Sequence, residues 1–261
     1  IAVNGPQDVR ELGEKLDWLR QRLAEIDAQK LTFLHHVSHE LKTPLATIRE
    51  GAELLCDQIV GPLTTEQEAV VQILRQDSLK LQSQVETLLD FNQALAQNKP
   101  LHLEVFDFSE LVMDVLARHR LALRSRDIMV NLDLQPAFIH GEKKQLEVVV
   151  DNLLSNAVKY STNNSAIKLM VNVENFEACF DVIDSGPGIY HRDKSRIFEP
   201  FFQGKNVPQG PLKGTGLGLA IVHRYIEMHH GTITVLDKSQ GAHFRIKLPA
   251  VSQGEESRNA S

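Results

Sequence analysis

The chain has 261 residues, a formal net charge of −6, and contents of 42% hydrophobic and 24% charged residues. A chain of this length can bury one substantial hydrophobic core or two modest ones. The mild acidity argues against a nucleic-acid-binding protein, because a phosphate backbone demands a concentrated basic face. No stretch approaches the roughly 18 apolar residues that span a bilayer, so the chain as given is expected to be soluble.

The cysteines and the start of the chain add two expectations. Cys56 and Cys179 lie far apart and outside any CxxC pattern, which predicts reduced thiols and argues against a disulfide framework or a zinc site. The chain starts at Ile1 without a methionine and carries no targeting pattern, so we interpret it as a fragment of a longer protein.

Apolar residues near the start of the chain repeat at alternating spacings of four and three, which predicts a coiled-coil stalk. This seam consists of Leu12, Leu16, Leu19, Leu23 and Ile26. A second seam between residues 37 and 59 predicts a helix that stops at Gly61-Pro62, because proline lacks the backbone donor that a helix needs.

Thr64 or Thr65 is expected to cap a further helix, which ends in the polar stretch 93–100. Residues 31–97 should therefore form two antiparallel helices. A lone helical hairpin leaves much of its apolar seam in water, so pairing with a second copy into a four-helix bundle is the physical expectation. We predict a homodimer.

The sequence pattern changes near residues 97–101 to short alternating strands, helices and glycine-rich loops, which predicts a domain boundary and an α+β domain. Strands are predicted at Ala166–Val173, Ala178–Asp184, Thr232–Asp237 and His243–Leu248, and helices at Ser109–Arg126, Gly141–Tyr160 and Gly218–His229. The helices should cover one face of a mixed sheet. Residues 251–261 lack apolar periodicity and are predicted to be a frayed tail.

His39 is the strongest candidate for a reactive residue in the first half. It lies in the run Ser38-His39-Glu40-Leu41-Lys42-Thr43-Pro44-Leu45. Helical periodicity places it roughly opposite the core positions, where a lone histidine is usually a solvated surface residue. Here Glu40 can accept a hydrogen bond from one ring nitrogen and leave the other nitrogen free to attack. Pro44 frees the carbonyl of Glu40 and favours a bend beside the histidine.

A zinc site at this histidine is a weaker interpretation. His35 and His39 are four residues apart, and His39-Glu40 begins like the motif HExxH. Thr43 stands where that motif requires its second histidine, and no third ligand is evident. His35 and His36 are therefore expected to be packing or surface residues.

The second half contains three groups of residues that together suggest a nucleotide site. Asn152, Asn156 and Lys159 lie near one face of a predicted helix, where amide oxygens suit Mg²⁺ and a lysine suits phosphate. Asp184 ends a strand before two glycines, which indicates either a turn or an acceptor for an amino group beside a flat ring. Residues 213–218 open a helix with alternating glycines, a pattern that lets backbone N–H groups approach phosphates.

Three familiar motifs do not explain these residues. The glycines at positions 214, 216 and 218 do not form GxGxxG, and no P-loop sequence occurs. His191-Arg192-Asp193 spells the protein-kinase triplet HRD, but Phe198 stands where the catalytic loop needs asparagine. We interpret the triplet as a coincidence.

Taken together and in this order, the residues closely resemble the sensor histidine kinase family over residues 5–249. The matching motifs are the H box at Ser38–Leu45, the N box at 152–160, the G1 box at Asp184–Ile189, the F box at Phe198–Phe202 and the G2 box at Gly214–Gly218. Residues 5–28 are similar to the trailing half of a HAMP segment, which implies a membrane-anchored sensor upstream. Segments 49–55 and 60–64 are similar to an enterobacterial branch whose regulators activate sigma-54 promoters.

The resemblance implies a multidomain chain. Residues 1–30 would be a HAMP remnant with a coiled-coil stalk, and residues 31–97 a dimerisation and histidine phosphotransfer domain whose helical hairpin forms a dimeric four-helix bundle. Residues 101–250 would be an α+β, Bergerat-type α/β sandwich, the ATP-binding fold shared with gyrase and certain chaperones. Such a chain is the cytoplasmic portion of a bacterial protein anchored in the inner membrane, in contact with the membrane only through an N-terminal part.

The resemblance also implies the catalytic residues. His39 would be the phosphoacceptor, with Glu40 assisting as general base. The implied activity is ATP-dependent autophosphorylation followed by transfer to an aspartate in the receiver domain of a response regulator. Thr43 matches a pattern that positions a water for dephosphorylating the regulator, so phosphatase activity is a second expectation.

ATP and Mg²⁺ are the implied cofactors. Asn156 would hold Mg²⁺ with Asn152 close by, Lys159 and Tyr160 would meet the phosphates or ribose, and Asp184 would bind the adenine amino group. The rest of the implied nucleotide set is Gly186, Gly188, Phe198, Lys213, Gly214, Thr215, Gly216, Leu217 and Gly218. The segment 203–213 would form an ATP lid.

Two other classes of function stay open. One is a non-catalytic dimeric scaffold that binds regulators without turnover, against which the complete set of motifs argues. The other is an ATPase of the gyrase or chaperone type, which does not carry the Ser38–Pro44 helix segment beside its nucleotide domain.

Overall fold

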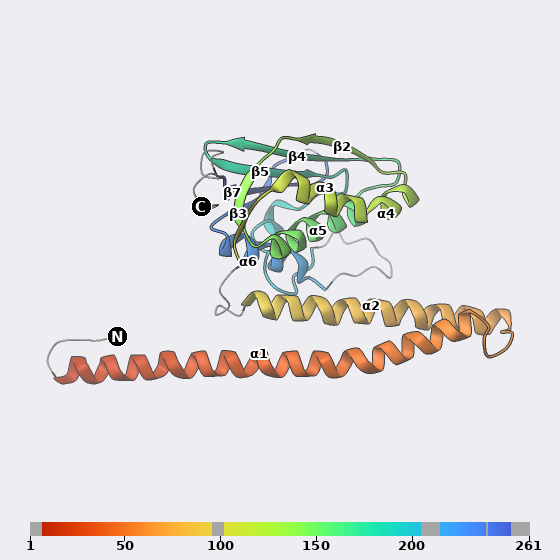
Figure 1. Cartoon of the computed structure of the whole chain (residues 1–261), viewed down its shortest axis with the longest axis horizontal. Helices are drawn as coiled ribbons and strands as arrows, with labels where there is room; N and C mark the ends of the chain where they lie inside the picture. The colour runs from red at the N-terminus through yellow and green to blue at the C-terminus, as the bar shows by residue number, and fades with distance from the viewer. Residues whose placement is uncertain (1–6, 96–101, 205–214, 239, 252–261) are drawn as a thin grey trace, which may run out of the picture. The chain divides into compact units, whose positions relative to one another are not determined.

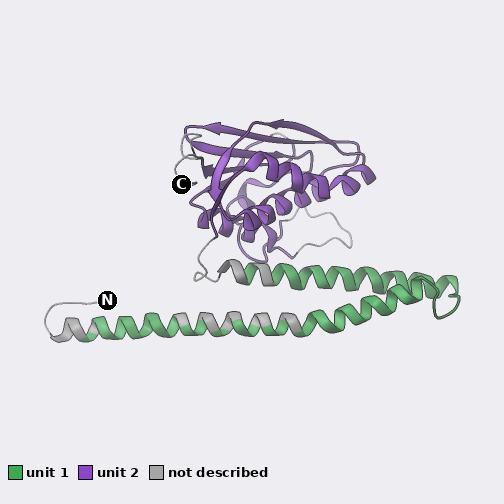
Figure 2. Cartoon of the chain, in the orientation of Figure 1, with its two compact units in different colours: residues 1–98 green, residues 99–261 purple. Residues whose placement is uncertain are grey.

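The computed structural model describes residues 7–95, 102–204, 215–238 and 240–251. The chain forms two compact units, residues 1–98 and 99–261, which Figure 2 shows in green and purple. In the described residues, no helix combines the length and the hydropathy that a membrane span requires.

The first unit is a helical hairpin of α1 (Gln7–Cys56) and α2 (Thr65–Leu95) (Figure 1). The stalk seam and the first hairpin helix are one continuous helix. It ends at Cys56, earlier than the predicted stop at Gly61-Pro62. The cause is a Schellman motif around Gln58, whose φ is +54°. The N–H groups of Ile59 and Gln58 close it by bonding the carbonyls of Leu54 and Leu55, at 3.2 and 3.1 Å.

Thr64 caps α2, which settles the choice between the two threonines of the prediction. Its Oγ1 accepts from the Gln67 N–H at 3.3 Å, and the Gln67 Oε1 accepts from the Thr64 N–H at 2.9 Å. This reciprocal pair is a capping box, which satisfies two donors that the first helical turn leaves without partners. Local hydrogen bonds therefore define both the end of α1 and the start of α2.

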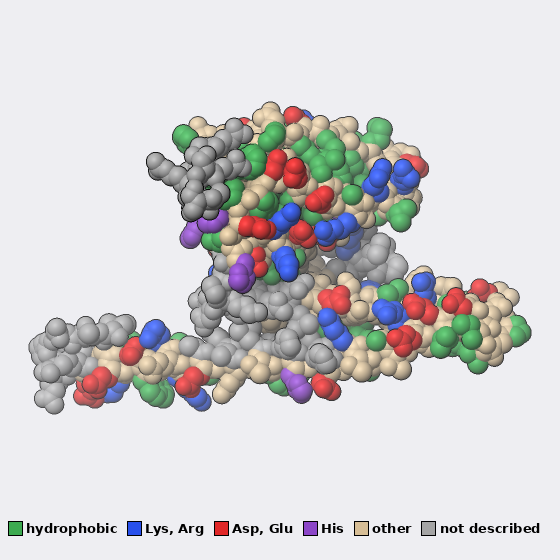
Figure 3. Space-filling model, in the orientation of Figure 1, with side chains coloured by type: hydrophobic (Ala, Val, Ile, Leu, Met, Phe, Trp, Pro, Cys, Tyr) green, Lys and Arg blue, Asp and Glu red, His purple; other side chains and the backbone are tan. Residues whose placement is uncertain are grey.

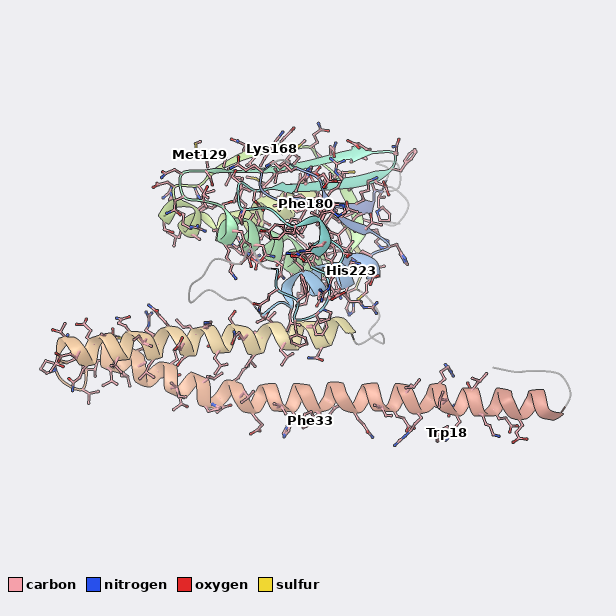
Figure 4. All side chains as sticks on the ribbon, turned by 180° about the vertical axis from the view of Figure 1, so that it is seen from behind. Trp18, Phe33, Met129, Lys168, Phe180 and His223 are labelled. Atoms are coloured by element: carbon pink, nitrogen blue, oxygen red, sulfur yellow. The ribbon has the colours of Figure 1, made fainter. Side chains whose placement is uncertain are left out.

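The two helices share a narrow core that includes Leu45, Ala52, Val71, Val85 and Phe91. Polar contacts also join them, with Arg49 Nη1 donating to Gln82 Oε1 at 3.1 Å. Many large apolar side chains stay exposed in the single chain, among them Leu16, Trp18, Leu19, Leu23, Phe33, Ile48, Ile73 and Leu74. Trp18 and Phe33 project from α1 in Figure 4. This is the unburied surface on which the expectation of a second copy depends.

Pro44 lies inside α1. Figure 1 shows the helix bending in its C-terminal part, in the half that pairs with α2. A proline removes one helical hydrogen bond and its ring crowds the preceding turn, so a bend near Pro44 has a local cause.

The second unit is built on a mixed five-stranded sheet with the order β2-β4-β5-β7-β6. Its strands are β2 (Met129–Leu134), β4 (Ala166–Glu174), β5 (Glu177–Ile183), β6 (Thr232–Leu236) and β7 (His243–Pro249). β2 pairs with β4 in parallel, and the other pairs are antiparallel. The four strands predicted from sequence are all present, within one residue at most ends.

Three strands escaped the sequence analysis: β2, and the antiparallel pair β1 (Glu104–Asp107) and β3 (Phe138–Gly141). The predicted helix at Ser109–Arg126 is in fact two helices, α3 (Phe108–Arg118) and α4 (Arg120–Ser125), which meet at His119. The His119 side chain is drawn to Asp151 of the next helix, with Nε2 and Oδ1 2.8 Å apart. That helix, α5, spans Lys143–Tyr160, because Gly141 belongs to β3.

Helices α3, α5 and α6 (Gly218–Met228) cover one face of the sheet (Figure 1), as predicted. The core between the layers contains Phe108, Leu111, Leu146, Leu153, Leu169, Phe180 and Ile226, each less than 2% exposed. Phe180, labelled in Figure 4, meets Phe108 edge to face, with ring centroids 5.5 Å apart. On the face drawn in Figure 3, acidic and basic side chains are interspersed instead of gathering into one basic patch.

His229 joins the end of α6 to the start of α5. The structure pairs its Nδ1 with the Tyr225 carbonyl at 2.7 Å, while its Nε2 receives the Glu142 N–H at 2.9 Å. This arrangement needs the neutral imidazole, since the protonated ring has no acceptor to offer. Burial lowers the pKa of His229 below its usual 6.5.

We expect the second unit to lose stability as the pH falls below 6.5, the ordinary pKa of histidine, and on through the lowered pKa of His229. The reason is that protons then bind the unfolded chain more readily than the folded one. His229→Gln, which can accept the same N–H without titrating, should flatten this part of the curve of unfolding free energy against pH. His230→Asn is the matched control for the exposed neighbour, and an equal flattening by both variants would contradict the assignment.

Candidate functional site

Asn152 links α5 to the start of α6. Its Nδ2 donates to the Val148 carbonyl at 2.9 Å. A Cβ added to Gly218 would lie only 2.4 Å from Asn152 Oδ1, so the glycine is required for this approach. The Asn152 amide nitrogen therefore bonds within α5, while its oxygen packs closely against the start of α6.

Asn156 lies one turn further along α5, half-buried. Within the part of the chain that the structure describes, its amide makes no hydrogen bond. Lys159 and Tyr160 end the helix, with Lys159 Nζ 5.2 Å from the centre of the Tyr160 ring. Burial raises the pKa of Tyr160 above its usual value, so its hydroxyl stays protonated.

Asp184 follows β5 and is 5% exposed. Its Oδ1 accepts from the N–H groups of Gly186 and Ala242, at 2.8 and 2.9 Å. Burial raises the pKa of this carboxyl, although the two N–H groups and the nearby Lys238 ammonium oppose the shift. No described residue uses Oδ2, so the group keeps an oxygen that can accept a hydrogen bond from a ligand.

Glycines make room for this aspartate. A Cβ on Gly186 would lie 2.7 Å from the Tyr160 carbonyl oxygen, and one on Gly241 would lie 2.0 Å from the Asp184 carbonyl oxygen. Gly188 (φ +72°) would place a Cβ 2.9 Å from the Gly241 carbonyl oxygen. The end of α5, the turn after β5 and the turn before β7 therefore meet backbone to backbone.

A second close backbone contact that requires a glycine lies at the start of α6. Gly216 has φ +73°, and a Cβ there would lie 2.7 Å from the carbonyl carbon of Phe201. The Phe201 N–H donates to the Gly216 carbonyl at 2.9 Å. Thr215 Oγ1 accepts from the Leu217 N–H at 3.2 Å just before the helix begins. Lys213 and Gly214, which the sequence analysis placed in the same loop, lie outside the described residues, as does most of the predicted lid.

Phe198 packs against α6. Its ring centroid is 5.3 Å from that of His223, which Figure 4 labels. The 3₁₀ helix η1 (His191–Asp193) precedes it and contains the HRD triplet. A Cβ added to Gly204 would lie 3.5 Å from Asp193 Oδ2, so this aspartate borders the chain that leaves the Phe198 segment.

The predicted phosphoacceptor segment lies in the other unit. His39 is within α1, and its side chain is outside the described residues. Glu40 and Thr43 are exposed. The Thr43 carbonyl accepts from Thr47 Oγ1 at 3.3 Å.

Sequence analysis missed three residues of the Asp184 surroundings. Ala242 donates to its carboxylate, Gly241 contacts its carbonyl, and Lys238 Nζ donates to that carbonyl at 2.9 Å. All three lie between the predicted strands 232–237 and 243–248, where a glycine signals a turn. The signal identifies the turn, but only the sheet register shows that it meets Asp184.

Asn156 fits the role of a Mg²⁺ ligand. Mg²⁺ takes oxygen ligands, keeps several waters and is commonly held by one or two protein groups together with substrate phosphates. The Asn156 amide makes no hydrogen bond in the described residues, whereas the Asn152 amide oxygen is packed closely against Gly218. In the described residues no three His, Cys, Asp or Glu side chains gather as metal ligands, so phosphate oxygens would have to complete the site.

Two family models match the chain. Residues 29–97 match the His Kinase A (phospho-acceptor) domain, and residues 141–252 match the histidine kinase-, DNA gyrase B- and HSP90-like ATPase. The first match contains His39, and the second contains the site around Asp184.

The chain is similar to proteins described as sensor histidine kinases. The sensor histidine kinase GlrK of Escherichia coli K12 is 41% identical over 251 residues, which cover 96% of this chain and 53% of that protein. The sensor histidine kinase QseE of Escherichia coli O157:H7 has the same identity and coverage. The chain spans about half the length of these curated relatives.

Solved structures are similar as well. Full-length ShkA, in complex with AMPPNP, aligns with a TM-score of 0.70 and 29% identity, covering 84% of this chain and 46% of ShkA. The Acinetobacter baumannii histidine kinase AdeS aligns with a TM-score of 0.59 and 28% identity, covering 82% of this chain and 98% of AdeS. These alignments agree with the predicted fold class, a helical region followed by an α/β ATPase domain.

The buried Asp184 carboxylate is expected to lower stability at neutral pH. Because burial raises its pKa, ionising this group costs more in the folded chain than in the unfolded one. Asp184→Asn should therefore raise Tm at pH 7, by about 2–4 °C for each kcal/mol relieved. The gain should vanish as the pH falls below 3.8, the ordinary pKa, where the carboxyl is neutral in both states.

Asp181, on the strand that precedes Asp184, provides the matched control. It is 1% exposed but paired with Arg245, whose Nε and Nη2 donate at 2.8 and 3.0 Å. Asp181→Asn should lower Tm, because it leaves a guanidinium without its counter-charge. Scanning calorimetry of both variants tests the sign, and a lower Tm for Asp184→Asn at pH 7 would refute the argument.

Proposed function

Because the chain belongs to the sensor histidine kinases, we propose that it is the catalytic core of one, using ATP to phosphorylate His39 and passing the phosphoryl group to an aspartate of a response regulator. The main support is the site around Asp184. A buried carboxylate with one free oxygen, between backbone segments kept clear by glycines, suits a flat ring that carries an amino group.

In this proposal Asp184 Oδ2 accepts the hydrogen bond of the adenine amino group, and Gly186 and Gly188 give the ring access. Lys159 and Tyr160 meet the phosphates or ribose. The loop before α6 presents backbone N–H groups at a helix N-terminus, where anions bind well. The remaining members of this set are Phe198, Lys213, Gly214, Thr215, Gly216, Leu217 and Gly218. The complex of the similar protein ShkA with AMPPNP supports a nucleotide at such a site.

We assign the Mg²⁺ contact to Asn156 alone. When bound, Mg²⁺ neutralises phosphate charge during transfer. Asn152 instead packs its side-chain oxygen against Gly218, so that α5, which carries Asn156, lies next to the loop before α6. This narrows the expectation that both asparagines meet the metal.

Autophosphorylation is an in-line displacement. One nitrogen of His39 attacks the γ-phosphorus of ATP, the bond from phosphorus to the bridging oxygen breaks, and ADP leaves with that electron pair. Glu40 accepts a hydrogen bond from the other ring nitrogen and so stabilises the charge that forms on the imidazole. The phosphorus–nitrogen bond is labile, and the group then moves to a carboxylate oxygen of the regulator, which regenerates His39.

We propose a homodimer as the working form. The exposed apolar residues of α1 and α2 would be buried by pairing with a second hairpin in a four-helix bundle. The second partner is the receiver domain of a response regulator. The natural setting in this proposal is the cytoplasmic portion of an inner-membrane-anchored bacterial protein, in which residues 1–30 form a HAMP remnant and stalk and residues 31–97 and 101–250 form the two catalytic domains.

Two alternatives are distinguishable. A gyrase- or chaperone-type ATPase shares the second family model but not the first, and the match of residues 29–97 to a phospho-acceptor domain argues against it. A non-catalytic scaffold would dimerise and bind a regulator without labelling itself. The test of the proposal is therefore transfer of phosphate onto the chain.

We expect the full chain, incubated with γ-labelled ATP and Mg²⁺, to acquire acid-labile, alkali-stable label, and His39→Gln to acquire none. The two proteins should bind ATP equally, since the substitution lies in the other unit. Equal label on both would show that a different residue is the acceptor. No label on either, with ATP bound, would favour the scaffold, and ATP hydrolysis without label would favour the ATPase.

Thr43 offers a separate test of phosphatase activity. We expect Thr43→Ala to autophosphorylate within about twofold of the parent but to dephosphorylate its phosphorylated regulator at least tenfold more slowly, because a water-positioning hydroxyl is lost. Thr47→Ala, one turn further on α1, is the control. Equal phosphatase rates for the parent and Thr43→Ala would remove Thr43 from this role.

A further inference from the structure

The C-terminal end of α5 lacks a cap of its own. Ser161 follows the helix with φ −60° and ψ 149°, so the chain leaves in an extended conformation and not through a left-handed residue. A left-handed glycine there would have let the next N–H groups bond the last carbonyls. The Ser161 N–H instead returns to the Ala157 carbonyl, at 3.0 Å. The later carbonyls need donors from elsewhere.

Arg126 supplies them from the turn after α4, more than thirty residues earlier. Its Nη1 donates to the carbonyls of Val158 and Lys159, the latter at 3.1 Å, and its Nη2 donates to the Ser161 carbonyl at 2.7 Å. Its Nε donates to Asn163 Oδ1 at 3.1 Å. A planar guanidinium has five N–H donors in a fixed fork and can reach all of these acceptors at once, which a lysine cannot do.

The capped end of α5 also sets the position of the Asp184 turn. The Tyr160 carbonyl oxygen is in such close contact with Gly186 that a Cβ there would lie 2.7 Å away. The Gly186 N–H in turn donates to Asp184 Oδ1 at 2.8 Å. A shift of the last helical turn would therefore displace the turn that holds the carboxylate.

Charge matters as well as position. The C-terminus of a helix carries about half a negative elementary charge on its free carbonyls. In the proposed function, Lys159 and Tyr160 at this end meet the phosphates or ribose of ATP, and an uncompensated negative helix end would repel them. The Arg126 guanidinium bonds directly to the carbonyls that carry this charge.

We propose that Arg126 is a positioning residue of the nucleotide site, which acts by capping α5 from outside the helix. It holds the end of α5 in register with the Asp184 turn and offsets the helix-end charge that opposes the phosphates. No contact between Arg126 and the nucleotide is invoked. The inference rests on the proposed ATP binding and adds to it a residue outside every motif of the sequence.

A second arginine that reaches α5 provides a matched control. Arg118, at the end of α3, also reaches α5, where its Nη2 lies 3.2 Å from Glu147 Oε2. That contact is to a half-buried side chain in the first half of the helix and not to its terminal carbonyls. Arg118→Met removes the same charge and a comparable surface contact, so it separates a general loss of cation from the loss of the cap.

The experiment compares the binding of ATP with that of adenosine to the full chain, each measured by chemical-shift titration. We expect Arg126→Met to weaken ATP binding about threefold to thirtyfold, the range of a charge at a helix terminus. Adenosine binding should weaken by a smaller factor, because adenosine reports on the Asp184 turn but carries no phosphates. Arg118→Met should leave the affinities for ATP and for adenosine within twofold of those of the parent. Arg126→Lys, which keeps the charge without the fork, should recover part of the ATP affinity.

An equal loss of affinity for ATP and adenosine in Arg126→Met, or no loss for either, would overturn the proposal, because the helix-end charge would then have no effect on the phosphates. If Arg126→Met does not fold, Arg126→Lys still tests the proposal. This variant should weaken ATP binding more than adenosine binding, and equal weakening of the two would count against the role of Arg126 as a cap. Failure of the parent chain to bind ATP would instead refute the proposed function, so the two failures are distinguishable.

Discussion

One oxygen of Asp184 holds the second unit's site together. By accepting two backbone N–H groups from different turns, it fixes the turn after β5 against the turn before β7. The contact is possible only because Gly186 and Gly241 have no side chain. The two backbone N–H groups thus orient the carboxylate through Oδ1, and Oδ2 stays able to accept a hydrogen bond. Its burial is unfavourable for the charged form, as expected for a site that gives up stability to recognise a ligand.

The helical half follows a different physical logic. α1 and α2 bury few apolar residues against each other and leave others in solvent, so the hairpin is incomplete as a single copy. Its local signals are nevertheless strong: a Schellman motif ends the first helix and a capping box starts the second. Local backbone chemistry therefore determines where the helices end, while their stability depends on what they pack against.

Prediction from sequence succeeded where periodicity or local chemistry carries the information. The strands around Phe180 and Phe244 and the cap at Thr64 could be anticipated, as could the grouping of Asn152, Asn156 and Lys159 on one helix face. It failed at His119, where a contact with Asp151 accompanies a break in an otherwise helical pattern, and at the short strands β1 and β3. Arg126 shows the limit most clearly, because no local pattern links an arginine to carbonyls more than thirty residues away.

The unbroken course of α1 has a mechanical consequence. From Gln7 to Pro44 the helix rises about 55 Å at 1.5 Å per residue without a proline or a recorded break. A continuous helix resists twisting and compression. A rotation or an axial displacement of its first turns is therefore transmitted to the segment that contains His39. Pro44 lies about one turn beyond His39, at the first position where a missing hydrogen bond lets the helix bend. A signal that arrives as torque can thus be converted there into a change of bend.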